Sequence, residues 1–375
     1  MKHELKMLYS TREQSESGKR NTALDMVRGI AILLIVIGHG NFVSGVPAVW
    51  LSTFHLPAFF LLSGWIAAEK ISKQQSIGEV VRHKATSVLV PYVWFSAGSL
   101  VLDLIQVARG SFTWDIFLGH LAETVSLQGY SVMWFLPVFF LTQIAVDLQS
   151  QFVKKQIRNE AAGHGVSAAL WTALALIVYV LYQKVFAPSL PAFWASEIRI
   201  VVKAVIGAAF YSYGTLLGCA VKGLLDKSKK IKVWLFVAGI CFTAVNVIAS
   251  FKCTIMDLNN LNVGFLLIYL LLGTTGSLGL ILICMMLPNI PVLTFFGQNS
   301  LIIMCTHLNF YVMYLAIRVT ELFAGMSRPL YVVCVFVITM LLEIMVILII
   351  RMFFPFVLGR ARAHREVSKM EKSKN

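Results

Sequence analysis

The chain has 375 residues, of which 58% are hydrophobic and 13% are charged, and its mean hydropathy is +0.77. A soluble domain carries about 25% charged residues. This composition therefore excludes a water-soluble globular enzyme and predicts a protein that crosses the membrane several times. A net charge of +14 would suggest a nucleic-acid partner in a soluble protein, but in a membrane protein basic residues accumulate in cytoplasmic loops.

The chain begins with a polar, basic stretch over residues 1–22, which we interpret as a cytoplasmic tail. The apolar run after it is too long for the hydrophobic region of a signal peptide, so we expect it to be retained as the first span. A transmembrane helix needs roughly 17–25 residues. The stretches that meet this need lie near 23–43, 50–68, 86–108, 131–148, 166–182, 199–221, 232–250, 264–287, 292–317 and 330–357.

The distribution of basic residues then predicts the orientation of these spans. With the N-terminus inside, 25 of the 32 Lys and Arg residues fall on the cytoplasmic side and six on the opposite side. This asymmetry follows the positive-inside rule and explains the net charge without nucleic acid. We expect an all-α, multi-pass protein of the plasma (inner) membrane with about ten transmembrane helices and both termini cytoplasmic. Its membrane domain would cover residues 23–357, followed by a basic tail over 358–375.

Ionisable side chains inside apolar runs are the candidate functional residues, because each is costly in a bilayer. Arg28 and His39 lie eleven residues apart in the first predicted span. At 100° per residue they share one helix face, about 16 Å apart along the axis. Asp25 lies one turn before Arg28 and can pair with it. The structural alternatives are that Arg28 anchors the helix end at the membrane surface and that His39 makes an interhelical hydrogen bond.

Two further groups lie in and after the second predicted span. His55 enters this span just before Pro57 and suits a structural role as well as a catalytic one. Arg82 and Lys84 follow on the predicted cytoplasmic side, directly before the third span. They are either ordinary positive-inside charge or a phosphate-binding pair for an anionic cofactor.

Several residues of the later spans complete the set of candidate functional residues. Trp134 lies where an aromatic ring stacks on a sugar or forms part of an interfacial belt. His307 follows an unusually polar segment that contains Asn299, and we expect it to line a cavity. Glu343 is expected to satisfy a buried neighbour. A further group of charges, which we expect to form local ion pairs rather than to bind an acidic acceptor, comprises Glu197, Arg199 and Lys203.

Five motifs in this order resemble those of the acyltransferase 3 family, closest to the branch of fucose 4-O-acetylase-like proteins. They are R-x10-H from Arg28 to His39, FHLPAFFLLSGW, RHK followed by VPY, MWFLPVFF at 133–140 and FFGQNSLIIMCTHLNF at 295–310. The resemblance runs from about residue 21 to 357 and implies O-acylation of a glycan, usually acetylation, with acyl-CoA as cytoplasmic donor. It further implies that Arg28 and His39 are the essential catalytic pair, and that Arg82 and Lys84, with Arg28, hold the phosphates of CoA.

We therefore expect a membrane O-acetyltransferase that moves an acyl group from acetyl-CoA to a hydroxyl of a cell-surface or lipid-linked glycan. His39 would act as general base or carry the acyl group itself. Residues expected to contact the acceptor are His55, His307, Trp134 and Asn299. No metal is expected, because the histidines lack carboxylate or cysteine partners at ligand spacing. The alternative is a transporter or flippase of a lipid-linked sugar, and the sequence leaves the acceptor and homo-oligomerisation open.

Overall fold

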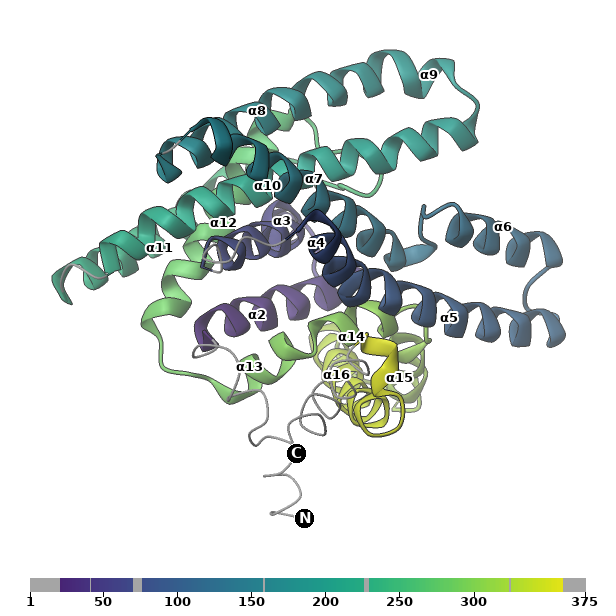
Figure 1. Cartoon of the computed structure of the whole chain (residues 1–375). Coiled ribbons are helices and arrows are strands. Elements are labelled where there is room, and N and C mark those ends of the chain that lie inside the picture. The colour runs from purple at the N-terminus through teal and green to yellow at the C-terminus, as the bar shows by residue number, and fades with distance from the viewer. Residues whose placement is uncertain are drawn as a thin grey trace, which may run out of the picture.

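A computed structural model describes residues 21–40, 42–69, 76–157, 159–225, 229–323 and 325–359 of the protein. The predicted basic tails, 1–22 and 358–375, lie almost entirely outside these residues. Within the described part of the chain, nine helical stretches are long and apolar enough to cross a membrane (Figure 1). They are α2 (Thr22–His39), α3 (Val46–Glu69), α4 (Ile77–Lys84) continuing through a π-helical turn into α5 (Val90–Ala108), α7 (Phe135–Gln156), α8 (Glu160–Leu181), α10 (Ala192–Leu225), α11 (Lys229–Ser250), α12 (Leu266–Met286) and α16 (Arg328–Phe353).

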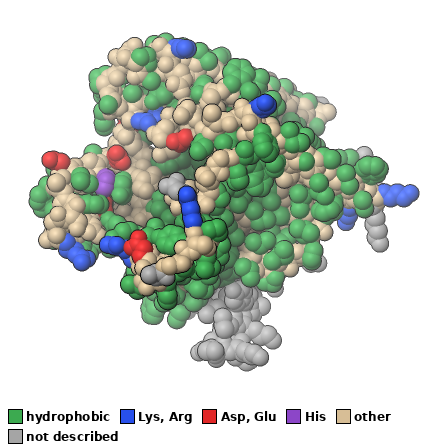
Figure 2. Space-filling model, turned by 180° about the vertical axis from the view of Figure 1, so that it is seen from behind, with side chains coloured by type: hydrophobic (Ala, Val, Ile, Leu, Met, Phe, Trp, Pro, Cys, Tyr) green, Lys and Arg blue, Asp and Glu red, His purple; other side chains and the backbone are tan. Residues whose placement is uncertain are grey.

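The surface of this bundle exposes many large hydrophobic side chains. Figure 2 shows hydrophobic side chains over much of the displayed face, with a few charged ones scattered among them. Among the exposed side chains are Leu322 at 81%, Trp234 at 72% and Ile248 at 67% of full accessibility. Such a surface is unusual for a soluble monomer and normal where lipid is the solvent. The prediction of an all-α polytopic membrane protein is confirmed.

The predicted span over 292–317 differs from the others, because it is three short helices and not one. These are α13 (Pro291–Gln298), α14 (Ser300–Thr306) and α15 (Val312–Glu321). Asn299 leaves the helical conformation after α13, and Tyr311 has a left-handed φ of +58° before α15. Interrupted backbone is tolerated at membrane depth where protein buries it. The interruption leaves His307 at the end of α14 and not in the middle of a helix.

Helix α2 is the central element for the site, and it packs against α3, α12 and α13. Its contact with α13 is made through backbone, because a Cβ on Gly297 would overlap the carbonyl group of Asp25. Gly64 of α3 contacts the carbonyl of Tyr211 in α10 in the same way. Small residues permit this close approach of membrane helices. These contacts fix the register of α2 and α3 against their neighbours.

The two ends of α2 define two sides of the bundle. We name them the Arg28 side and the His39 side, after Arg28 in the first half of this helix and His39 at its end. In Figure 1, α2 runs from the left toward the centre, and the short helices α6 (Trp114–Val125) and α9 (Ala187–Ser189) lie at the right-hand end of the bundle. The cytoplasmic location of the Arg28 side stays a prediction from the distribution of basic residues.

Candidate active site

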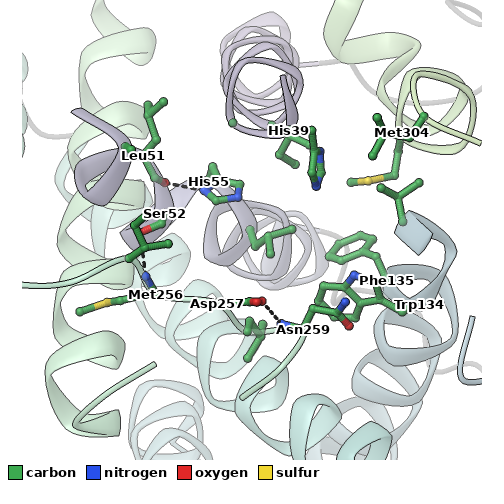
Figure 3. Close-up of a pocket in the computed structure, with 18 of the residues that line it drawn as sticks. His39, Leu51, Ser52, His55, Trp134, Phe135, Met256, Asp257, Asn259 and Met304 are labelled. Atoms are coloured by element: carbon green, nitrogen blue, oxygen red, sulfur yellow. Dashed lines mark hydrogen bonds between the residues drawn. The ribbon is translucent and has the colours of Figure 1, made fainter. Parts of the chain in front are cut away.

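A cavity of about 490 Å³ lies at the His39 side of the bundle (Figure 3). It is lined by the end of α2, the first half of α3, residues 131–135, the 255–259 segment and residues of α14. Most of the lining is apolar, and its polar groups come from residues that include Ser52, His39, His55, Ser131, Asp257 and Asn259. A mostly apolar cavity with a few convergent polar groups is the usual form of a binding or active site.

His39 reaches this cavity from the last turn of α2. The helix ends there, and the N–H of Gly40 bonds the carbonyl of Val36 at 3.2 Å. The His39 ring is exposed, and its Nδ1 lies 3.0 Å from Nε2 of His307. Although 268 positions separate the two histidines, the packing of α14 on α2 brings them together.

Hydrogen bonding assigns the protonation of this histidine pair. Nδ1 of His307 lies 2.7 Å from the carbonyl oxygen of Ile303. A carbonyl can only accept, so this Nδ1 carries the proton and Nε2 of the neutral ring is an acceptor. His39 must then donate its Nδ1–H to His307. The Nε2 atom of His39 is left with its lone pair and is available as a base in the cavity.

His55 is a second imidazole on the cavity wall, presented by α3. Its Nδ1 donates to the carbonyl oxygen of Leu51, one turn earlier. The same tautomer argument leaves its Nε2 as an acceptor. Figure 3 shows His39 and His55 on neighbouring walls of the cavity. Both rings can therefore accept a proton from a ligand hydroxyl.

The side of the cavity opposite His39 is formed by the segment between α11 and α12. Asp257 holds a turn there: its Oδ1 accepts from the backbone N–H groups of Asn259 at 2.9 Å and Asn260 at 3.2 Å. A reciprocal pair of 2.9 Å backbone bonds joins Asp257 to Asn262. The Oγ of Ser52 accepts from the N–H of Met256 at 3.0 Å and so ties the segment to α3. The sequence analysis did not single out these residues, although D-L-N-N at 257–260 is typical of a turn.

The expected ion pairs among Glu197, Arg199 and Lys203 are wrong. Each of the three side chains has another partner: Glu197 accepts from Gln128, Arg199 donates to Ser196 and Asn260, and Lys203 donates to Asn259. Lys203 also lies 4.2 Å above the ring of Trp134, a cavity residue. The segment between α11 and α12 supplies amide partners where the sequence analysis expected carboxylates.

Comparison with known proteins assigns the family. The acyltransferase domain characteristic of acyltransferase 3 proteins matches residues 21–348, most of the chain. The chain belongs to the acyltransferase 3 family. The nodulation protein NolL of Mesorhizobium japonicum is 24% identical to this acyltransferase over 151 residues, which are 38% of this chain and 39% of NolL. The aligned region thus covers well under half the length of that relative, and no solved structure matches significantly. Of the two predicted classes of function, membership of this family favours the enzyme over the transporter.

Of the residues predicted for the acceptor and for catalysis, His39, His55 and Trp134 line the cavity of this acyltransferase. His307 is fully buried and touches the cavity residue His39. Asn299 is outside the cavity, and its Oδ1 accepts from Arg351 at 2.7 Å. The structure thus brings the histidines together and places Asn299 elsewhere.

The predicted donor residues lie outside this cavity, toward the Arg28 side. Arg28 pairs with Asp25 at 3.4 Å, as expected from their spacing. Lys84 lies 3.4 Å from Asp147, which ties the start of the third span to α7. Arg82 is exposed on α4. Their role in binding a donor stays a prediction.

Two further expectations concern Glu343 and the presence of a metal site. Glu343 is fully buried and accepts from the hydroxyl of Thr306 at 3.0 and 2.8 Å, so the prediction that it satisfies a buried neighbour is confirmed. Across the described ranges, no group of three or more His, Cys, Asp and Glu residues could hold a metal ion. The residues that line the cavity bring imidazole, carboxylate, amide and hydroxyl groups to it.

Proposed function

We propose that this acyltransferase moves an acetyl group from acetyl-CoA to a hydroxyl of a cell-surface or lipid-linked glycan at the plasma membrane. The observation that carries the proposal is the His39–His307 pair, which leaves Nε2 of His39 as a free acceptor at the cavity. A neutral imidazole is suited to remove a proton from an alcohol near neutral pH. Membership of the acyltransferase 3 family makes an acyl group the transferred unit.

The proposed reaction runs through Nε2 of His39. This nitrogen takes the proton of the acceptor hydroxyl while the hydroxyl oxygen attacks the carbonyl carbon of the thioester. The tetrahedral intermediate then collapses and the C–S bond breaks. CoA leaves as a thiolate, while His39 holds the proton that it took from the hydroxyl. During the step the Nδ1–H of His39 stays bonded to His307, which holds the ring in place. A variant of this route, in which Nε2 takes the acetyl group first, differs in forming an acyl-imidazole.

The donor would approach from the opposite end of α2. His39 lies eleven positions after Arg28 on α2, a rise of about 16 Å, and an extended pantetheine arm is suited to such a distance. Arg28, Arg82 and Lys84 would contact the phosphates, because guanidinium and ammonium groups bind phosphate oxygens. This assignment rests on the predicted cytoplasmic location of the Arg28 side, since acyl-CoA is made in the cytoplasm.

The acceptor would occupy the cavity at the His39 side. His55 offers a second acceptor nitrogen, and Trp134 offers an aromatic face for the apolar side of a sugar ring. His307 would act on the acceptor through His39, because it has no place on the cavity wall. Asn299 makes no contribution in this arrangement.

Transfer of radiolabel tests the proposal. The full-length protein in lipid nanodiscs receives [14C]acetyl-CoA and the envelope glycans of a strain that lacks it, and base-labile label on the glycan is counted. We expect transfer, and a loss of about 10²–10⁴ in rate for His39→Ala, the usual contribution of a positioned base. His120→Ala is the matched control, since His120 pairs with Asp103 outside the cavity. No transfer to any glycan fraction, or full activity of His39→Ala, would contradict the proposal.

A further inference from the structure

Lys203 is a buried cation whose partners point to a role at the acceptor end of the cavity. Its side chain is in α10, and the residue is only 4% exposed. Buried ammonium groups normally pair with carboxylates, because desolvation is costly. In the described part of the chain no carboxylate lies within 4 Å of this ammonium; its partners are the Oδ1 of Asn259 at 3.0 Å and the ring of Trp134. Both partners line the cavity.

The bond from Lys203 decides how the Asn259 amide is oriented. An ammonium group can only donate, so the atom facing Lys203 must be the amide oxygen. The NH₂ group of Asn259 then points away from Lys203, and among the residues that the structure describes it has no hydrogen-bond partner. The nearby positive charge also polarises the amide and strengthens its donors. Asn259 therefore presents two N–H donors at the wall that faces His39 across the cavity in Figure 3.

The carboxylate of Asp257 defines which ligands suit this wall. Its Oδ1 accepts from two backbone N–H groups, and its Oδ2 accepts from the side chain of Asn260 at 2.7 Å. These bonds hold the turn that carries Asn259. The carboxylate also brings a negative charge to the cavity wall, which disfavours an anionic ligand beside it. A neutral, hydroxyl-rich ligand fits the donors of Asn259 and avoids this repulsion.

We propose that Asn259, positioned by Lys203, selects a neutral sugar as acceptor by donating to one of its oxygens while the ring stacks on Trp134. Another hydroxyl of the same sugar would then face Nε2 of His39. Lys203 acts only through Asn259 and is a positioning residue. This inference rests on the proposed function, since it names the acceptor class of the same cavity.

Binding of simple glycosides without acetyl-CoA tests the inference separately from acyl transfer. The full-length protein in nanodiscs is titrated with methyl glycosides of glucose, galactose and fucose, and with methyl glucuronide as the anionic probe. Binding is measured by the shift in thermal unfolding temperature. We expect at least one neutral glycoside to bind saturably and more tightly than the glucuronide. Tighter binding of the glucuronide, or no saturable binding of any neutral glycoside, overturns the inference.

Four variants then test which residues the affinity for the glycoside depends on. Asn259→Leu and Lys203→Met should raise the half-saturating glycoside concentration about tenfold, the loss expected for one hydrogen bond. Lys203→Arg keeps a donor toward the amide and should restore most of the affinity. Asn260→Leu is the matched control, because it disturbs the same turn without facing the cavity. Equal effects of Asn259→Leu and Asn260→Leu would show a merely structural role and overturn the inference.

Kinetics with acetyl-CoA separate this inference from the proposed function. In the variants at Asn259 and Lys203 we expect a higher KM for the glycoside and an unchanged KM for acetyl-CoA. Transfer with an unchanged glycoside KM overturns the inference while the proposed function stands. Saturable, Asn259-dependent glycoside binding without any transfer supports the inference and contradicts the proposed function.

Discussion

Replacing His307 should slow the reaction without removing any group that touches the substrate. The buried ring of His307 fixes the Nδ1–H tautomer of His39 through a 3.0 Å bond and is itself fixed by the carbonyl of Ile303. In His307→Leu both partners lose their bond inside the protein. An unmade buried hydrogen bond costs about 1–3 kcal/mol, which lets His39 leave its productive tautomer and orientation. At about 1.4 kcal/mol per factor of ten, kcat should fall about 5- to 150-fold.

His307→Gln provides the rescue. The side-chain oxygen of Gln can accept from His39 while its NH₂ donates to the Ile303 carbonyl, so this variant should recover much of the lost kcat. Steady-state transfer from [14C]acetyl-CoA measures kcat and the KM for acetyl-CoA, and this KM should not change, because only transition-state positioning is lost. Thr306→Val serves as the packing control: it removes a neighbouring buried bond to Glu343, and Thr306 makes no hydrogen bond to His39 among the described residues. Wild-type kcat in His307→Leu, or a His307→Gln variant as slow as His307→Leu, would refute the positioning of His39 by His307.

Three other predictions follow from the same structure. Charge reversal of Arg82 and Lys84 should weaken acetyl-CoA binding, measured by equilibrium dialysis, while the protein still inserts in the membrane; unchanged affinity would exclude this donor site. Gly297→Ala forces a Cβ against the backbone of α2 and should cost about 1–3 kcal/mol of stability, seen as a lower unfolding temperature; an unchanged temperature would show that the helix contact can shift. A cysteine at the exposed Ser111 should react with an impermeant maleimide in intact cells, and one at Ser76 only after permeabilisation; the reverse pattern would invert the predicted orientation.

The parts of the architecture that could be predicted are those that local sequence determines. Membrane spans need long apolar runs whatever their neighbours are, so their positions follow from hydropathy. The shared face of Arg28 and His39 follows from the geometry of one continuous helix, and so does the pairing of Arg28 with Asp25. The family resemblance rested on motifs of the same local kind.

The parts that could not be predicted depend on contacts between distant segments. His39 and His307 meet only because the 292–317 region is interrupted, and its apolar residues gave no sign of the left-handed turn at Tyr311. The partner of Lys203 was misjudged because a charge pattern favours a carboxylate as partner, whereas the fold presents the amide of Asn259, 56 positions away. Hydropathy does not predict such polar contacts, because they depend on how helices are arranged around the cavity.

The interrupted α13–α14 segment and helix α2 together explain how the histidine that we propose as the base can be oriented inside a membrane bundle. An imidazole on a continuous, lipid-facing helix would have no polar partner and no acceptor to set its tautomer. Here α13 is held against α2 by the backbone contact at Gly297. The helix is then interrupted at Asn299, and α14 ends with His307 directly beside His39. The interruption places the end of α14 within the protein, and the contact at Gly297 fixes the position of that end. A base oriented in this way needs no carboxylate in the apolar interior, where an unpaired negative charge would be costly.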